Sequence, residues 1–282
     1  MSVRRTALIL ALLSGATEAC ATSAPAPNLP MMQATGTWQA NLGLDEGKPF
    51  TELPDQGFRL VDVSGYSLAG RVRYASLWSF AEVHGWEERR DLDAASLLRA
   101  NEEAATRGMV IARLRTFDVP DGARFAAIWE LGAPGSRTLR LGLKPEQVAR
   151  AASDEHVLDL AGYASGGEER FAEIVTPRSA DDALSIGVHP TLDGGAFDAL
   201  IRDLAASGGR PWRIAARVVD GVPRFSVLTS NAPGSPWISA RDLDAADYQR
   251  RVEDMIFVGY HTAEIAAYVV DGAPRFAVTW MQ

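Results

Sequence analysis

Four ionisable side chains recur at one position of a repeated pattern, and they are the residues best suited to contact a ligand. They are Arg59, His156, Arg210 and His261, each two residues after a position that is glycine in most copies. Guanidinium and imidazole groups donate hydrogen bonds to anions and to the oxygen atoms of sugars and peptides. If all copies fold alike, these side chains line one rim, where we expect ligand contacts. The alternative is that residues at the start of a strand are polar because they are solvated.

Residue patterns for catalysis are weaker. The four histidines fall in separate copies, so no metal-ligand spacing such as H-E-x-x-H occurs. Residues 65–69 (GYSLA) resemble a nucleophile elbow, but the last residue is not glycine and two predicted strands flank the segment, whereas an elbow joins a strand to a helix. Neither Lys48 nor Lys144 has a serine three residues before it, so an S-x-x-K box is absent. The sequence predicts no catalytic residue, no metal and no cofactor.

The repeated pattern is marked five times by an arginine followed by an aromatic residue. The marks are Arg73-Tyr74, Arg124-Phe125, Arg170-Phe171, Arg224-Phe225 and Arg275-Phe276, and successive marks lie 51, 46, 54 and 51 residues apart. This period is typical of stacked supersecondary units, none of which buries its apolar face alone. The sequence predicts a repeat domain over 38–282, with units at 38–85, 86–136, 137–182, 183–236 and 237–282. We expect the five arginines to pair with a carboxylate or stack on an aromatic ring within each unit rather than to bind a row of anions.

Each unit is predicted to be an amphipathic helix followed by a β-hairpin. A glycine recurs sixteen residues before the mark, except for Asp154 in unit three, and should end the helix in a left-handed conformation. Asp93 and Asp244 stand where N-caps are expected, and turn pairs such as Asp121-Gly122 connect the two strands. Segments such as residues 86–92 and 237–243 are expected to be short connections. The predicted fold class is α+β, a superhelix of five β-β-α units that is either open or closed into a ring.

Unit boundaries and one irregular unit also carry predictions. Trp38, Trp86 and Trp237 open units, and we expect them to fill gaps between units rather than to offer sugar-stacking surfaces. In unit four, Trp212 is out of phase and Arg217 replaces an aromatic residue, which indicates either a site or drift. Neither end of the domain has an evident polar cap. This predicts that the last hairpin meets the first unit or that the ends pair in a homodimer, unless local side chains cover them.

Three stretches resemble a known family. GFRLVDVSGYSLAGRVRYASLW (57–78), ARFAAIWE (123–130) and the Trp-to-Gly-Leu segment at 38–44 are similar to bacterial tandem repeats that also form the N-terminal domain of polyglycine-hydrolase-type serine proteases. The resemblance covers about 38–282 and is strongest in units one, two and five. It implies a superhelix of β-β-α units and an exported setting. It transfers no catalytic residue, because that family's catalytic serine lies in a separate β-lactamase-like domain, whose S-x-x-K box does not occur here.

The first residues are typical of an export signal. Arg4 and Arg5 precede an apolar run from 7 to 13 that is too short to span a bilayer, and Ala19-Cys20-Ala21 suits cleavage after Ala21. We predict a signal peptide at 1–21 and a Pro/Ala/Ser-rich linker at 22–37. The protein is expected to be periplasmic or secreted. The alternative is a lipoprotein, in which a lipid on Cys20 would be the one contact with the membrane.

The charge balance bears on the partner. The net charge of −8 argues against nucleic acid, because an acidic surface repels phosphate backbones. We predict an exported, non-catalytic binding or scaffolding protein whose partner is a protein or a glycan. Two alternatives stay open. One is a hydrolase with a site in units three and four that uses His156 or His189 with nearby acids, and the other is a self-associating structural protein of the envelope.

Overall fold

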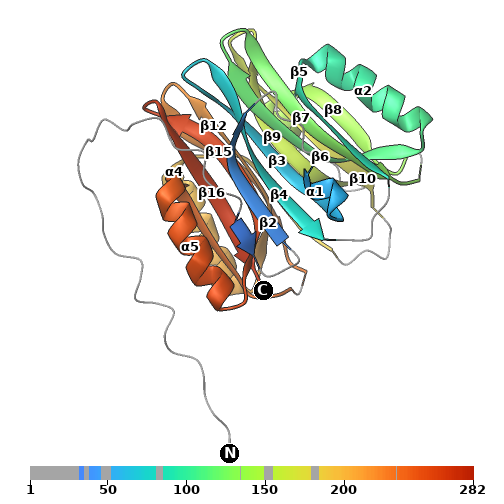
Figure 1. Cartoon of the computed structure of the whole chain (residues 1–282). Helices are drawn as coiled ribbons and strands as arrows, with labels where there is room; N and C mark the ends of the chain where they lie inside the picture. The colour runs from blue at the N-terminus through green and yellow to red at the C-terminus, as the bar shows by residue number, and fades with distance from the viewer. Residues whose placement is uncertain are drawn as a thin grey trace, which may run out of the picture.

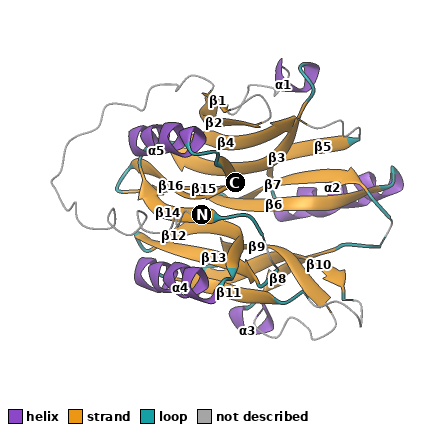
Figure 2. Ribbon diagram, turned by 90° about the horizontal axis from the view of Figure 1, so that it is seen from below, coloured by secondary structure: helices purple, strands orange, loops and turns teal. Residues whose placement is uncertain are grey.

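The computed structural model describes residues 32–34, 38–45, 52–80, 85–133, 135–148, 155–178, 184–232 and 234–282. The predicted signal peptide, Cys20, His84, Asp154 and most of the predicted linker lie outside these residues. The described chain contains five repeat-like units, as predicted, and its helices lie around the outside of the strands (Figures 1 and 2).

The elements follow the order strand, helix, strand and strand in every unit, and unit one has the additional strand β1 in front. Unit one comprises β1 (Met32–Ala34), β2 (Trp38–Asp45), α1 (Glu52–Asp55), β3 (Phe58–Leu68) and β4 (Arg71–Phe80). Unit two comprises β5 (Trp86–Leu92), α2 (Ala94–Thr106), β6 (Met109–Val119) and β7 (Gly122–Leu131). Unit three comprises β8 (Thr138–Leu143), α3 (Pro145–Val148), β9 (Glu155–Ser165) and β10 (Glu168–Pro177). Unit four comprises β11 (Ile186–Leu192), α4 (Gly194–Ser207), β12 (Arg210–Val219) and β13 (Val222–Ser230). Unit five comprises β14 (Trp237–Leu243), α5 (Ala245–Phe257), β15 (His261–Val270) and β16 (Ala273–Met281).

Each unit forms one antiparallel sheet with the last strand of the unit in the middle. The strand orders are β1-β2-β4-β3, β5-β7-β6, β8-β10-β9, β11-β13-β12 and β14-β16-β15. We call β3, β6, β9, β12 and β15 the inner strands, because each contacts the inner strands of the neighbouring units, and β15 also contacts β3. We call β2, β5, β8, β11 and β14 the edge strands, although in unit one the short strand β1 lies outside β2. The hairpin of each unit therefore supplies the middle and inner strands.

The edge strands correct two predictions. The segments 86–92 and 237–243, expected to be connections, are the strands β5 and β14. Since α1 and α3 have four residues each and every sheet has at least three strands, the domain is mostly β rather than α+β. Within the predicted linker, residues 32–34 form β1, which pairs antiparallel with β2.

Local signals place the longer helices as predicted. The side chains of Asp93 and Asp244, and also of Asp193, each accept a hydrogen bond from the backbone N–H three residues later, and so cap α2, α5 and α4. The recurring glycines adopt the left-handed conformation at Gly57, Gly108, Gly208 and Gly259. These glycines let the chain leave the helix and turn into the inner strand.

A β-bulge interrupts every inner strand at the same place. In β3 the register with β4 shifts between Leu60 and Asp62. Equivalent shifts precede Arg113, Asp159, Arg213 and Glu264. A bulge adds one residue to a strand and re-aims the side chains beside it. The same backbone irregularity therefore precedes a charged residue in all five units.

The core of the described residues consists of five apolar clusters, and each cluster joins two units. Four of them join consecutive units, as where Val63 and Trp78 of unit one pack with Phe117 of unit two. The fifth packs Trp280 and Phe276 of unit five with Tyr66, Leu77 and other residues of unit one. Unit five thus contacts unit one through the same kind of apolar cluster that joins consecutive units.

Candidate functional site

One charged residue stands at the same position of every inner strand, eleven residues before the arginine mark. In chain order these residues are Asp62, Arg113, Asp159, Arg213 and Glu264. They and Arg115 form what we call the inner-strand charge cluster. Asp62, Asp159, Arg113, Arg115 and Glu264 are buried, whereas the side chain of Arg213 is 25% exposed. Five units of the chain therefore meet at one group of ion pairs.

Arg115 lies at the centre of this cluster. Its Nη1 donates to Asp159 Oδ1 at 2.9 Å, and its Nη2 donates to Asp62 Oδ2 at 2.9 Å and to Glu264 Oε2 at 3.1 Å. Burial opposes the charge of Arg115, but the three carboxylates outweigh burial and raise its pKa. For Asp159, burial opposes ionisation, and the neighbouring arginines, Arg115 above all, still hold the pKa of the carboxyl below its ordinary value. Both groups are therefore charged over the physiological pH range.

Arg113 and Arg213 approach a single carboxylate oxygen. Glu264 Oε1 accepts hydrogen bonds from Arg113 Nη2 at 2.6 Å and from Arg213 Nη1 at 3.0 Å. Among the described residues, Arg213 forms an ion pair with Glu264 alone, although the charge of Asp159 also acts on it. Burial and then the nearby charge of Arg113 lower its pKa to about 10. Arg213 is thus the least compensated cation of the cluster.

The sequence contains a signal for this cluster that the glycine and the arginine mark do not reveal. The position eleven residues before the mark holds an ionisable residue in all five units, with alternating signs in chain order. Charges are rarely buried in a core unless they are paired. One ionisable residue at the same position of every apolar inner strand therefore indicates buried ion pairs between the units.

A cavity of about 170 Å³ lies between inner strands, nearer their hairpin ends, and we call it the inner-strand cavity. Residues of four units line it, among them Tyr66 and Ser67, Phe117 and Asp118, Arg217, and Tyr268. Phe117 packs onto the backbone of unit one because residue 65 is glycine, where a Cβ atom would lie 2.4 Å from the ring. The walls thus combine aromatic and aliphatic side chains with three polar residues, Ser67, Asp118 and Arg217.

The polar groups of this cavity carry opposite charges. Burial raises the pKa of Asp118, although Arg217 acts in the opposite direction. Arg217 also forms an ion pair with Glu169 of unit three, which accepts a further hydrogen bond from Thr191 Oγ1 at 3.1 Å. Arg217 is the residue at which unit four departs from the aromatic pattern, so this departure lies at the cavity wall.

The four predicted ligand contacts lie near the starts of inner strands in four different units. Arg59 Nη1 lies 3.5 Å from Glu130 Oε2 of unit two, and His156 is buried in β9 opposite Thr176. Arg210 lies with its Cζ atom 5.4 Å from the centroid of the Trp212 ring. All four side chains thus lie beside residues of their own unit or of a neighbouring unit. Their role in ligand binding stays a prediction.

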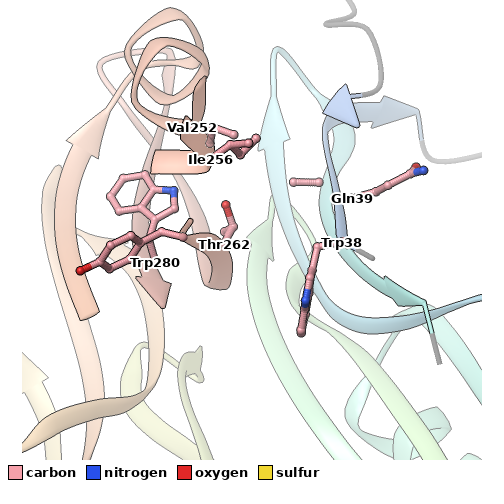
Figure 3. A pocket seen from close by; sticks show the side chains of 8 residues that line it. Trp38, Gln39, Val252, Ile256, Thr262 and Trp280 are labelled. Atoms are coloured by element: carbon pink, nitrogen blue, oxygen red, sulfur yellow. The ribbon is translucent and has the colours of Figure 1, made fainter. Parts of the chain in front are cut away.

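His261 lies where unit five meets unit one. Its ring stacks on Trp38, with centroids 4.1 Å apart and planes at 20°, and burial lowers its pKa. A narrow pocket opens beside this stack, lined by Trp38 and Gln39 on one side and by Val252, Ile256 and Trp280 on the other (Figure 3). Its volume of about 10 Å³ has room for about one water molecule. This pocket is therefore too small to hold an organic ligand.

The other boundary tryptophans also pack between units, as predicted. Trp86 of unit two lies edge-on to Trp78 of unit one, with ring centroids 6.0 Å apart. The indole N–H of Trp237 in unit five donates to the carbonyl of Gly209 in unit four at 3.0 Å. Large aromatic rings therefore fill the boundaries between units.

The two histidines proposed for a hydrolase site lie in separate sheets. His156 lies in β9 and His189 in β11, in different sheets, and burial lowers the pKa of His189. Within the described ranges, no group of three or more His, Cys, Asp or Glu side chains is arranged to hold a metal ion. None of the helices in that part of the chain is long and apolar enough to cross a membrane.

Comparison with known proteins identifies the repeat. The family described as "Polyglycine hydrolase-like, structural repeat" matches residues 35–81, 83–130 and 234–282, which together make up just over half of the chain. These stretches correspond to units one, two and five, where the resemblance in the sequence is strongest. No curated protein matches the chain. The chain therefore belongs to the polyglycine hydrolase-like structural repeat family.

Proposed function

We propose that the protein is an exported, non-catalytic binding module whose five units close into a ring around the inner strands. Three contacts between unit five and the first two units support closure. Tyr66 and Trp280 share an apolar cluster, Ser64 Oγ accepts a hydrogen bond from the Ala267 N–H at 2.9 Å, and Arg113 pairs with Glu264. A closed ring leaves no apolar end face that would need a polar cap.

The observation that carries the binding function is the inner-strand cavity. Its wall is assembled from residues of four units, so no single unit could form it. Ligand sites combine apolar walls with a small number of polar groups, and Ser67, Asp118 and Arg217 supply such groups here. The partner we propose is a protein or a glycan that inserts one polar group, such as a peptide side chain or a sugar ring, into this cavity.

Blocking the cavity tests this function. Ser67→Trp should fill the cavity with an indole ring and weaken binding at least about tenfold, because the inserted group loses its place. The matched control is Arg71→Trp, which adds the same ring at an exposed position across the hairpin and outside the cavity. Fluorescently labelled wild-type and variant proteins are applied to glycan and peptide arrays, and the affinity for each retained probe is measured by titration.

The controls decide how the result is interpreted. Thermal unfolding must show that both variants are folded, and Arg71→Trp should bind as the wild type does. Equal binding by folded Ser67→Trp and the wild type would contradict a site in the cavity. A wild-type protein that retains no probe from either array would contradict the binding function itself.

A further inference from the structure

Three residues near the start of β12, and Arg113 of β6, which contacts β12, hold N–H groups that are buried and have no acceptor among the described residues. The groups are Arg113 Nη1, Arg210 Nε, Trp212 Nε1 and Arg213 Nε. A buried donor without an acceptor costs about 1–3 kcal/mol, so such groups are usually paired with protein, water or a ligand. Unpaired donors on adjoining residues of β12 and β6 are therefore typical of a position where water or a ligand binds.

These four residues are held close together by contacts of their own. The Cζ atoms of Arg210 and Arg213 lie 5.4 and 4.9 Å from the centroid of the Trp212 ring. Arg113 and Arg213 share the Oε1 oxygen of Glu264. Trp212 is the extra residue of the bulge in β12, since the register shifts between Pro211 and Arg213. The bulge that positions the charged residue in every unit here also positions an indole N–H beside it.

The charges of this region leave one cation uncompensated. The inner-strand charge cluster has three arginines and three carboxylates. Arg210 adds a fourth positive charge, and no carboxylate of the described residues lies within ion-pair distance of it. Glu264 is the one carboxylate in that part of the chain that pairs with Arg213, and it also serves Arg113 and Arg115. A bound group with one negative charge would balance the region.

We propose that Arg113, Arg210, Trp212 and Arg213 form a binding site for a small oxyanion, either a carboxylate or a phosphate group. The N–H groups of a guanidinium match the spacing of the oxygen atoms in both anions. Hydrogen bonds between ionised groups are also stronger than those between neutral groups. The exposed quarter of the Arg213 side chain provides access from solvent. This site is separate from the inner-strand cavity, which none of the four residues lines, so either proposal can fail without the other.

Nuclear magnetic resonance of the donor groups tests the site directly. In ¹⁵N-labelled protein, the Nε–H signals of arginine and the Nε1–H signal of Trp212 are followed while sodium acetate or sodium phosphate is added at constant ionic strength, with sodium chloride as the reference. We expect saturable shifts of the Arg213 and Trp212 signals with at least one oxyanion. The preferred anion distinguishes a carboxylate site from a phosphate site.

Two variants separate the site from general salt effects. Arg213→Gln should raise the apparent Kd at least about tenfold, because it removes charge-assisted hydrogen bonds. Arg202→Gln, which removes the same charge from an exposed position of α4 in the same unit, should leave the Kd unchanged. If Arg213→Gln does not fold, Trp212→Phe provides the test, since it removes one donor and should weaken the shift at Arg213 without abolishing it.

Specific outcomes would overturn the proposal. Shifts that are equally large in sodium chloride, or equally large at the Arg202 signal, would mean that only ionic strength is sensed. A Trp212 N–H that exchanges magnetisation with a bound water and does not respond to either oxyanion would mean that water satisfies the donors.

Discussion

The arginine that marks each unit forms an ion pair within its own unit in four cases. Arg73 pairs with Asp45, Arg124 with Asp91 at 3.3 Å, Arg170 with Glu168, and Arg275 with Asp244 at 3.9 Å. These pairs are partly exposed, where each contributes at most about 1 kcal/mol. The pairing with carboxylates expected from the sequence is confirmed for these four. Replication of the unit has therefore replicated a structural ion pair.

The stack of His261 on Trp38 predicts a pH-dependent stability. Burial lowers the pKa of His261 in the folded protein, so below the unfolded value of about 6.5 the unfolded chain binds more protons. The stabilisation that the neutral His261 ring contributes to the folded protein is therefore present above about pH 6.5, and it is lost as the pH falls below that value. His261→Phe keeps an aromatic ring on Trp38 without a titrating group. When the pH is lowered from 7.5 to 5.5, the free energy of unfolding in urea should fall less for His261→Phe than for the wild type. The difference between the two falls should be up to about 1 kcal/mol.

The control for this prediction is Tyr260→Phe, an adjacent change that leaves the imidazole of His261 in place. It should follow the wild-type pH dependence. An identical pH dependence for His261→Phe and the wild type would show that His261 does not contribute.

At the scale of elements, two local hydrogen-bond arrangements recur in several of the units. One is the aspartate N-cap of α2, α4 and α5. The other is a hydroxyl contact across the sheet, where the N–H of Gly142 donates to Tyr163 Oη at 2.8 Å and the N–H of Asp242 donates to Tyr268 Oη at 3.0 Å. These N–H groups belong to residues with positive φ next to the bulges of edge strands. Tyrosine thus satisfies a backbone donor that the bulge removes from the strand ladder.

The N-cap of α5 gives a prediction at this scale. Asp244→Ala should lower the free energy of unfolding by about 1 kcal/mol, because the N–H of Asp247 loses its acceptor, 2.7 Å away. Asp244→Asn should lose much less, since the amide oxygen can still cap the helix although the ion pair with Arg275 is gone. Urea unfolding of both variants checks this.

Asp254→Ala, an exposed change on the same helix, serves as the reference and should stay within about 0.5 kcal/mol of the wild type. If the free energy of unfolding fell as much in Asp244→Asn as in Asp244→Ala, the charge of Asp244 rather than its N-cap hydrogen bond would be the stabilising feature.

At the scale of the whole molecule, the proposed ring depends on contacts between residues far apart in the sequence. Arg113 and Glu264 are 151 residues apart, and they belong to units two and five. Breaking a buried pair leaves an uncompensated charge and costs about 3–5 kcal/mol. A double-mutant cycle with Arg113→Met and Glu264→Gln should therefore give a coupling energy of about 1–3 kcal/mol in urea unfolding if the units close.

Sedimentation velocity at the same protein concentrations shows whether the coupled species is a monomer. Coupling in a monomer supports the ring, whereas coupling confined to a dimer would mean that units of two chains meet. A coupling energy within about 0.5 kcal/mol of zero would contradict closure.

The sequence alone determined the features that depend on neighbouring residues. The five marks gave the number of units, Asp93 and Asp244 the helix starts, and the recurring glycines the helix ends, because caps, turns and left-handed positions depend on a few adjacent residues. Only the tertiary structure decided which segments pair. The segment WEERRDL became the strand β5 because β7 offers it a ladder of backbone partners, which its own sequence does not reveal. The charge cluster joins residues 44 to 151 positions apart, and the ionised state of Asp159 depends on arginines from other units. Burial and charge pairing are properties of residues that packing brings together, so they are decided only when the units meet.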